Sequence, residues 1–166
     1  MAFRIPIVGS IFAAVLAAAC SPSPAPDAPD AAPASVAAAP VALPTMTVYK
    51  TPTCGCCKNW VEHIQQAGIS VEVHDLPDLT EIKNEAGVPG DARSCHTAIV
   101  DGYAIEGHVP AAAIKRLLQE RPAVAGLAVP GMPVGSPGME VPGQAPDRYD
   151  VIAFQRDGSS SVFKSH

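Results

Sequence analysis

The spacing of apolar residues first predicts a strand, a helix and a second strand. Residues 46–50 form a β-branched and aromatic run, which is typical of a strand. Residues 56–67 carry apolar side chains at helical spacing, and Gly68 marks the end of this predicted helix. Residues 69–74 alternate between apolar and polar and predict the next strand. Such a unit favours a parallel strand pair joined by a right-handed crossover.

The following residues predict a second helix and a hairpin. Asp78 is typical of a helix N-cap, and Glu81 is its predicted capping-box partner. Two strand-like runs at residues 97–100 and 103–106 flank an Asp-Gly dipeptide. An Asp-Gly pair between two such runs is a strong signal for a two-residue hairpin turn.

The last part of the chain predicts a helix, a long loop and a final strand pair. The helix runs from Pro110 to about Pro122, and a Gly/Pro-rich loop covers residues 129–146. Two more strand-like runs at residues 149–155 and 160–164 are expected to pack on the domain or extend its sheet. The predicted fold class is therefore α/β: a thioredoxin-like mixed sheet with flanking helices plus a C-terminal β-hairpin.

The N-terminal residues predict an exported protein. Residues 1–19 combine Arg4 with an apolar run and small residues, which is typical of a signal peptide. Cys20 follows in the manner of a lipobox, so we expect it to be the lipidated first residue of the mature chain; a free Cys20 thiol after ordinary cleavage is the alternative. Residues 20–44 are rich in Ala and Pro and predict a tether. The expected location is the periplasm, with membrane attachment only through the lipid, and the folded domain is predicted to cover residues 45–166.

Charge and composition exclude some function classes. The formal net charge is -5 and no run of Lys or Arg occurs, so no nucleic-acid partner is expected. No Ser-His-Asp set, carboxylate pair or phosphate-binding loop stands out, and no catalytic residue is predicted. Whether the protein is an enzyme stays open at this point.

Three cysteines within four residues are the strongest chemical signal. Cys54, Cys56 and Cys57 lie where the first strand meets the first helix, and free N–H groups at a helix N-terminus stabilise thiolates. Soft sulfur ligands select copper(I), zinc or iron–sulfur clusters. Cys95 is expected just before the third strand, beside this triplet, where thioredoxins usually have a cis-proline. We therefore predict that the four cysteines bind copper(I), with the crowded thiolates bridging several ions.

Other chemistry for these cysteines remains open. Export makes disulfides common, so two bridges, for instance Cys54–Cys57 with Cys56–Cys95, are an alternative. The C-x-x-C spacing also suits a thiol–disulfide oxidoreductase of the thioredoxin type. A zinc-stapled or interaction module is a third possibility.

Four further residues are candidate copper ligands. Met132 and Met139 flank a Gly/Pro-stiffened loop, and thioethers are soft copper ligands, although adaptable core filling is the usual role of methionine. His96 and His108 are candidates because imidazole binds copper(II) well. His96 adjoins Cys95, but neighbours on a strand point to opposite faces. A hydrogen-bonded or surface histidine is the alternative for both.

Three segments together resemble one family. Over about residues 45–165 the chain resembles the CopG-type periplasmic copper-resistance proteins. The resemblance lies in the segments YKTPTCGCCKNWVEHIQQAG, SCHTAIVDGYAIEGHVP and GMPVGSPGME. The resemblance implies a thioredoxin-like fold and a copper cluster. It also implies a role in copper handling that extends to cycling between copper(I) and copper(II). Its implied partners are copper ions and other periplasmic copper carriers or efflux components, and its implied copper ligands are Cys54, Cys56, Cys57 and Cys95.

Overall fold

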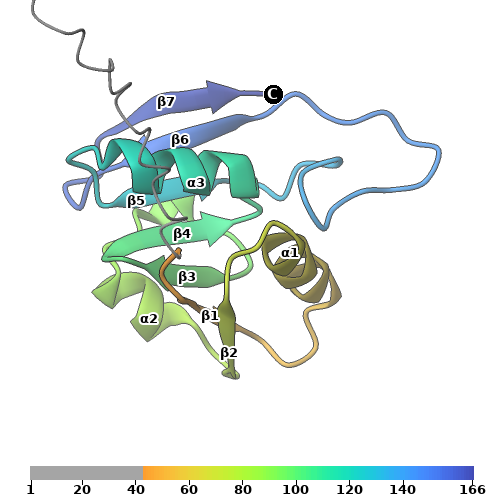
Figure 1. Ribbon diagram of the computed structural model, residues 1–166, viewed down its shortest axis with the longest axis horizontal. Coiled ribbons are helices and arrows are strands. Elements are labelled where there is room, and N and C mark those ends of the chain that lie inside the picture. The colour runs from red at the N-terminus through yellow and green to blue at the C-terminus, as the bar shows by residue number, and fades with distance from the viewer. Residues whose placement is uncertain (1–42) are drawn as a thin grey trace, which may run out of the picture. The chain divides into compact units, whose positions relative to one another are not determined.

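The computed structural model describes residues 43–166, which form a seven-stranded sheet with flanking helices (Figure 1). The strand order is β2-β1-β3-β4-β5-β6-β7. No helix in this part of the chain has the length and apolar character needed to cross a bilayer. The predicted signal peptide, Cys20 and nearly all of the tether lie outside the described residues. In chain order the elements are β1 (Met46–Lys50), α1 (Gly55–Gln66), β2 (Val71–Asp75), α2 (Thr80–Glu85), the 3-10 turn η1 (Gly90–Ala92), β3 (Thr97–Val100), β4 (Tyr103–Gly107), α3 (Ala111–Glu120), β5 (Gly126–Val129), β6 (Asp150–Phe154) and β7 (Ser160–Ser165).

The first four strands have the pairing of the thioredoxin fold. β1 pairs in parallel with β2 and antiparallel with β3, and β3 pairs antiparallel with β4. Helix α1 forms the crossover between the two parallel strands. The predicted Asp-Gly turn joins β3 to β4, and both Asp101 and Gly102 have positive φ, as this tight turn requires. The predicted thioredoxin-like α/β class is confirmed.

The C-terminal hairpin extends the sheet rather than packing on its face. β5 pairs in parallel with β4, and β6 and β7 then add antiparallel strands. β5 was not predicted from the sequence. All four of its residues are buried, so its side chains do not alternate between apolar and polar and give no strand period.

Side chains from the two faces of the sheet form two apolar clusters. In β4, Tyr103 and Ile105 join the larger cluster, which contains the buried residues of α3 and all of those of α1 except Cys57. Ala104 between them joins the smaller cluster with Ala86, directly after α2. Because successive strand residues point to opposite faces, α1 and α3 cover one face and α2 covers the other.

The predicted capping box at Asp78 and Glu81 is wrong. Helix α2 begins at Thr80, its N-cap is Leu79, and no side chain caps it. Asp78 Oδ1 instead accepts hydrogen bonds from the backbone N and the hydroxyl of Thr80, at 3.0 and 2.8 Å. A short Asp side chain reaches donors two residues ahead most easily, so it forms a turn one position before the helix starts.

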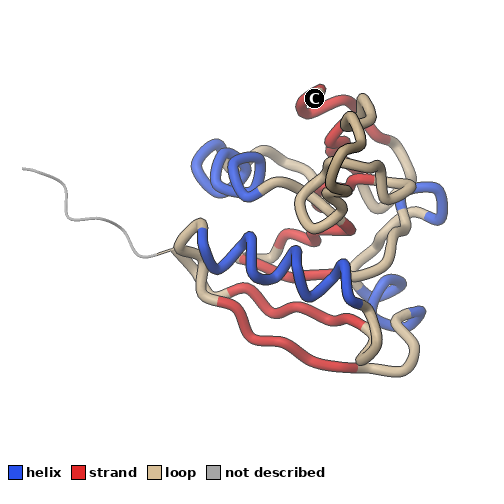
Figure 2. Tube along the Cα trace, turned by 90° about the vertical axis from the view of Figure 1, so that its right-hand side faces the viewer, coloured by secondary structure: helices blue, strands red, loops and turns tan. Residues whose placement is uncertain are grey.

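A long loop connects β5 to β6 and passes the N-terminal end of α1. Figure 1 shows it extending past this helix, and in Figure 2 it is the coiled tan segment below the C-terminus. Val134 and Asp147 close the loop: the Val134 N–H donates to the Asp147 carboxylate, and the Asp147 N–H donates to the Val134 carbonyl, both at 2.9 Å. The segment of residues 134–147 is therefore closed at its two ends.

We expect Trp60→Phe to lower the free energy of unfolding by about 1–3 kcal/mol, because the buried carbonyl of Val109 would lose its donor. Trp60 is fully buried, and its Nε1 donates to that carbonyl at 2.9 Å, which ties α1 to the start of α3. Urea unfolding followed by circular dichroism measures the change, since the chain has no other tryptophan. Gln65→Ala on the exposed face of α1 is the control, and an equal loss in both variants would contradict the role of the hydrogen bond.

Candidate metal centre

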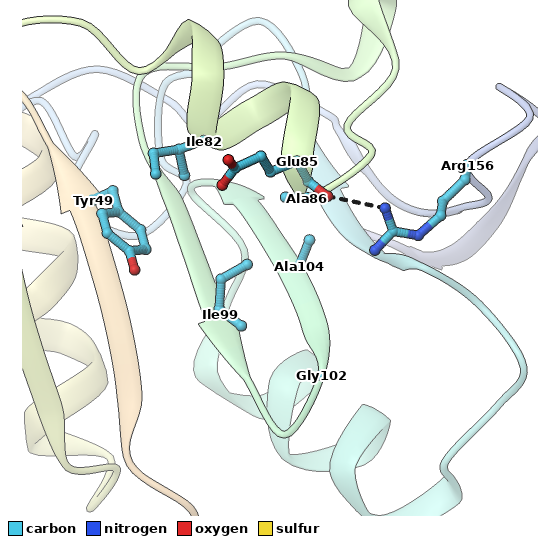
Figure 3. Close-up of a pocket in the computed structure, with 8 residues that line it drawn as sticks. All are labelled: Tyr49, Ile82, Glu85, Ala86, Ile99, Gly102, Ala104 and Arg156. Carbon is cyan, nitrogen blue, oxygen red and sulfur yellow. Dashed lines mark hydrogen bonds between the residues drawn. The ribbon is translucent and has the colours of Figure 1, made fainter.

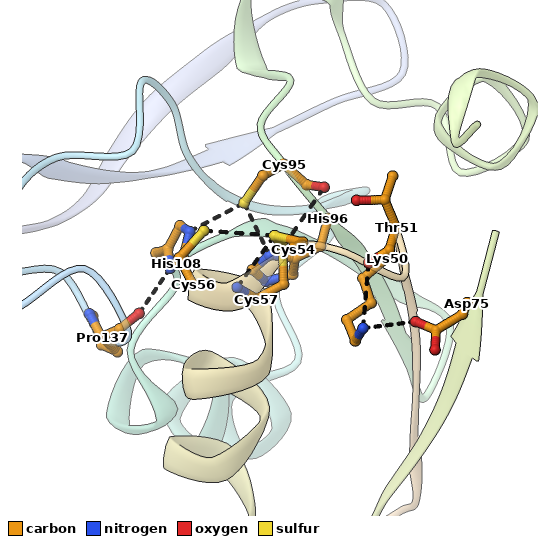
Figure 4. Close-up of a disulfide and its surroundings, with 10 residues drawn as sticks. All are labelled: Lys50, Thr51, Cys54, Cys56, Cys57, Asp75, Cys95, His96, His108 and Pro137. Atoms are coloured by element: carbon orange, nitrogen blue, oxygen red, sulfur yellow. Dashed lines mark hydrogen bonds and ion pairs between the residues drawn. A yellow bond between two sulfur atoms is a disulfide. The ribbon is translucent and has the colours of Figure 1, made fainter. Parts of the chain in front are cut away.

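Three cysteines surround the N-terminus of α1. Cys54 is the N-cap, and its Sγ accepts from the Cys57 backbone N–H at 3.3 Å. Cys54 and Cys57 form a disulfide, while Cys56 and Cys95 are free (Figure 4). Cys56 Sγ lies 3.5 Å from Cys54 Sγ. One of the two bridges considered from the sequence is therefore present, and Cys56–Cys95 is not bonded.

The fold brings Cys95 to the same place from a distant part of the sequence. It lies in the segment between η1 and β3, and its carbonyl oxygen is 4.0 Å from Cys57 Sγ. The Sγ atoms of the four cysteines all lie within 4.8 Å of one another. The spatial grouping expected from the sequence is present, and it forms a compact set of soft donor atoms.

Two buried histidines contact the sulfur atom of Cys95. Cys95 Sγ lies 3.2 Å from His96 Nδ1 and 3.1 Å from His108 Nε2. His108 Nδ1 lies 2.8 Å from the carbonyl oxygen of Pro137, which only accepts, so Nδ1 carries the proton and Nε2 faces the sulfur with a lone pair. His96 precedes the first residue of β3, so the strand rule that separated it from Cys95 does not apply. The three ligand atoms lie within 4.8 Å of one another.

Burial keeps this part of the site uncharged when no cation is bound. Burial raises the pKa of the Cys95 thiol to about 12, and the nearby Cys56 adds to the increase. Burial lowers the pKa of His96 well below its usual value, and the proximity of two other basic groups, His108 and Lys83, lowers it further. Burial also lowers the pKa of His108. A metal ion must therefore displace the thiol proton, so binding to Cys95 would release it.

The β5–β6 loop contacts the cysteine cluster at Gly138. A Cβ atom at this position would lie 2.7 Å from the carbonyl oxygen of Cys56 and 2.7 Å from the backbone N of Trp60. Met139 comes next in the chain and is half-buried, whereas Met132 is 42% exposed. The geometry therefore favours Met139 over Met132 as the methionine near the cluster.

Comparison with known proteins points to one family. A family model described as "Protein of unknown function, DUF411" matches residues 92–139, which include Cys95, both histidines and the first half of the β5–β6 loop. No curated protein sequence matches. Two solved structures, described as copper resistance protein CopG form 1 and form 2, are each 44% identical to this chain, with a TM-score of 0.70. Each match covers 75% of this chain and 98% of the CopG chain.

This chain belongs to the CopG family. The match confirms the family that the three sequence segments indicated. Within this CopG family member, four sulfur atoms and two imidazole nitrogens provide donors that could hold a metal ion. Thiolates and imidazoles bind copper and zinc, whereas calcium and magnesium prefer oxygen ligands.

The sequence did not indicate some residues that shape the CopG site. Glu106 and Lys83 form a buried ion pair whose carboxylate also accepts from the backbone N of Ser94, the neighbour of Cys95. The sequence signal for this ion pair is Glu106, a single acidic residue in the otherwise apolar run of β4. His63 of α1 is half-buried, and its Nε2 accepts from the Ala111 N–H at the start of α3.

A separate cavity of about 260 Å³ lies beside α2 and contains neither cysteine nor histidine (Figure 3). Arg156 closes one side of it and donates to the carbonyl oxygen of Glu85 at 3.0 Å. Ile82, Ile99 and Ala104 make much of its lining apolar. This cavity offers no soft donor atoms and is not part of the metal centre.

Gly138→Ala is expected to destabilise the protein by about 1–3 kcal/mol and to move the loop away from the cluster. A Cβ atom would contact the Cys56 carbonyl, and the φ of +83° is unfavourable for any residue with a side chain. Thermal unfolding and hydrogen exchange of the loop measure both effects. Gly143→Ala is the matched control, because its φ is +82° but nothing lies within 4 Å of its Cβ position. Equal destabilisation by both changes would show that the contact with α1 is unimportant.

Proposed function

We propose that this protein binds copper(I) through the thiolates of Cys54, Cys56, Cys57 and Cys95 and acts in copper resistance or homeostasis. The observation that carries the proposal is the grouping of four sulfur atoms within 4.8 Å of one another. Homology to copper resistance protein CopG supports copper over zinc. Crowded thiolates repel one another, and bridging several copper(I) ions neutralises more of their charge than one tetrahedral ion would.

The disulfide supports a second part of the proposal, which is copper redox cycling. The Cys54–Cys57 bridge must accept two electrons to give two thiolates before all four sulfurs can bind copper(I). Two copper(I) ions that are oxidised to copper(II) can supply these electrons. His96 and His108 would then offer nitrogen ligands to an oxidised ion, and Met139 a thioether to a reduced one.

A thiol–disulfide oxidoreductase is the second candidate function. The disulfide across a C-x-x-C segment at a helix N-terminus of a thioredoxin-like fold favours it. Two additional free thiols beside this disulfide favour the copper proposal instead. An insulin-reduction assay separates the two: activity that survives Cys95→Ser but is lost with Cys54→Ser would support the oxidoreductase.

We also propose that the protein acts in the periplasm and is held at a membrane by lipid on Cys20. The signal-peptide pattern of residues 1–19 and the following cysteine support this location. Bound copper would then be exchanged with other periplasmic copper carriers or with efflux components. A single acyl chain binds membranes weakly, so stable attachment requires several chains on the same cysteine.

We expect the reduced protein to bind more than one copper(I) ion per chain under anaerobic conditions. The experiment uses a Cys20→Ser background, so that every remaining thiol belongs to the cluster. Copper is titrated against a copper(I)-specific chromophoric chelator, and bound copper is counted after desalting. Cys56→Ser should lower the number of bound ions, because it removes one of the four bridging sulfurs.

One copper ion per chain or fewer, or unchanged binding by Cys56→Ser, would contradict the copper(I) cluster. Ser136→Ala is a control on the loop, since its hydroxyl bonds only to the Pro133 carbonyl among the described residues. Parallel titration with zinc tests the zinc-stapled alternative. Stoichiometric zinc that copper(I) cannot displace would support that alternative instead.

Cys20→Ala is expected to move the protein from the membrane fraction to the soluble periplasmic fraction in a bacterial host. Lipid attachment requires the cysteine thiol, whereas the rest of the export signal is unchanged. Fractionation with mass spectrometry of the mature N-terminus measures the result. An unmodified Cys20 on the mature wild-type chain would rule out lipidation and leave export to the periplasm as a separate question.

A further inference from the structure

A fully buried carboxylate lies behind the cysteine cluster. Glu106 of β4 has no exposed surface, and its two oxygens accept three hydrogen bonds. Oε1 accepts from Lys83 Nζ at 2.5 Å and from the backbone N of Ser94 at 2.6 Å. Oε2 accepts from the Thr97 hydroxyl at 2.7 Å, and the Thr97 oxygen in turn accepts from Lys83 Nζ at 3.0 Å.

Stability alone does not explain this buried ion pair. Removing two charges from water costs free energy, and replacing such a pair by apolar residues is often neutral or stabilising. Lys83 extends from the short helix α2, and its Nζ reaches both Thr97 and Glu106. The hydrogen bonds of the pair converge on one segment of the chain rather than spreading through the core.

That segment carries Cys95. Ser94 precedes the cysteine and Thr97 follows two residues later, so Glu106 holds the chain on both sides of it. The Gly107 N–H also donates to the carbonyl of His96 at 3.0 Å. A Cβ atom at Gly107 would lie 2.5 Å from the Ser94 hydroxyl, so the segments that contain Gly107 and Ser94 are in direct contact.

The ion pair and the sulfur cluster hold this segment from opposite faces of the sheet. Glu106 and Ala104 are two residues apart in β4 and share a face, and Ala104 packs in the cluster that contains Ala86 after α2. His96 instead contacts Trp60 of α1, with ring centroids 4.3 Å apart. Glu106 therefore holds the backbone around Cys95 from the face of the sheet that α2 covers, while the Cys95 side chain faces the other cysteines.

We propose that Glu106, held in place by Lys83, is a positioning residue of the metal centre. Its hydrogen bond to the Ser94 N–H keeps Cys95 Sγ directed at the other three sulfurs. This role rests on the proposed copper function for its consequence, but the geometry it controls exists without copper. Outer groups that orient metal ligands typically contribute about 10–100-fold to metal affinity.

Two double variants separate the hydrogen bond from the charge. Lys83→Met with Glu106→Leu removes both charges and the acceptor for the Ser94 N–H. Lys83→Met with Glu106→Gln also removes both charges, but the amide oxygen still accepts from Ser94 and the amide N–H₂ can donate to the Thr97 hydroxyl. Neither variant leaves an unpaired buried charge, so both are expected to fold. Circular dichroism and thermal unfolding check this.

The first measurement is copper(I) affinity, by chelator competition in a Cys20→Ser background. We expect the leucine-containing variant to bind copper(I) about 10–100-fold more weakly than wild type. The glutamine-containing variant should recover most of this loss. Equal affinity of the leucine-containing variant and wild type would overturn the proposal, and so would an equal loss in the two variants.

The second measurement needs no copper and reports the position of Cys95 itself. With Cys20, Cys54 and Cys57 replaced by serine, Cys56 and Cys95 are the only thiols left. Their disulfide is allowed to form in a defined glutathione buffer, where oxidised glutathione accepts the two electrons, and is counted by mass spectrometry after alkylation. Bridging should fall in the leucine-containing variant and recover in the glutamine-containing one; unchanged bridging would overturn the proposal.

These readouts distinguish failure of the proposal from failure of the copper function. A wild-type protein that binds no copper(I) would refute the copper function, while the Cys56–Cys95 bridging would still decide the role of Glu106.

Should the leucine-containing variant fail to fold, Ser94→Pro replaces it. This change removes the N–H donor together with the Ser94 hydroxyl, so Ser94→Ala, which keeps the N–H, is its control; the preceding Arg93 already has the extended ψ of 141° that proline requires. Ser94→Pro must then weaken copper binding and bridging, and wild-type values for both would overturn the proposal.

Discussion

Antiparallel hydrogen bonding between β1 and β3 brings the end of one strand beside the start of the other. Tyr49 near the end of β1 faces Thr97 at the start of β3, so the residues just beyond each strand share one edge of the sheet. The chain after β1 carries the first three cysteines, and the chain before β3 carries Cys95. The thiols gather because of this register, and a shift of one residue would turn each side chain to the other face.

The cluster combines soft donor atoms, which favour a soft cation, with a buried environment that favours the uncharged forms of these donors when no cation is bound. Burial favours the protonated thiol of Cys95 and the neutral imidazoles of His96 and His108. Without a metal, Cys95, His96 and His108 therefore add no buried charge, and the disulfide removes two further thiolates. A bound cation replaces the proton and compensates the thiolate charge, so binding and deprotonation are linked.

The site is assembled from three separated parts of the chain, and a different interaction holds each part in place. The N-terminus of α1 holds the early cysteines, and the ion pair of Glu106 with Lys83 holds the segment of Cys95. The β5–β6 loop reaches the same place because Gly138 allows close backbone contact with Cys56. Sheet strands added after the thioredoxin-like core thus anchor a loop that contacts the candidate metal centre at Gly138.

The sequence by itself determined the order of the elements other than η1 and β5, the hairpin turn and the cysteine triplet, because these depend on local spacing and turn chemistry. It also indicated the CopG family through three short segments. Only the tertiary structure decided β5, whose residues are all buried, and the side-by-side placement of His96 and Cys95, which lie just outside a strand. The ion pair of Glu106 and Lys83 joins residues 23 positions apart, and no local period reports such a contact. Long-range register and burial set these features, and neither is encoded in the neighbouring residues alone.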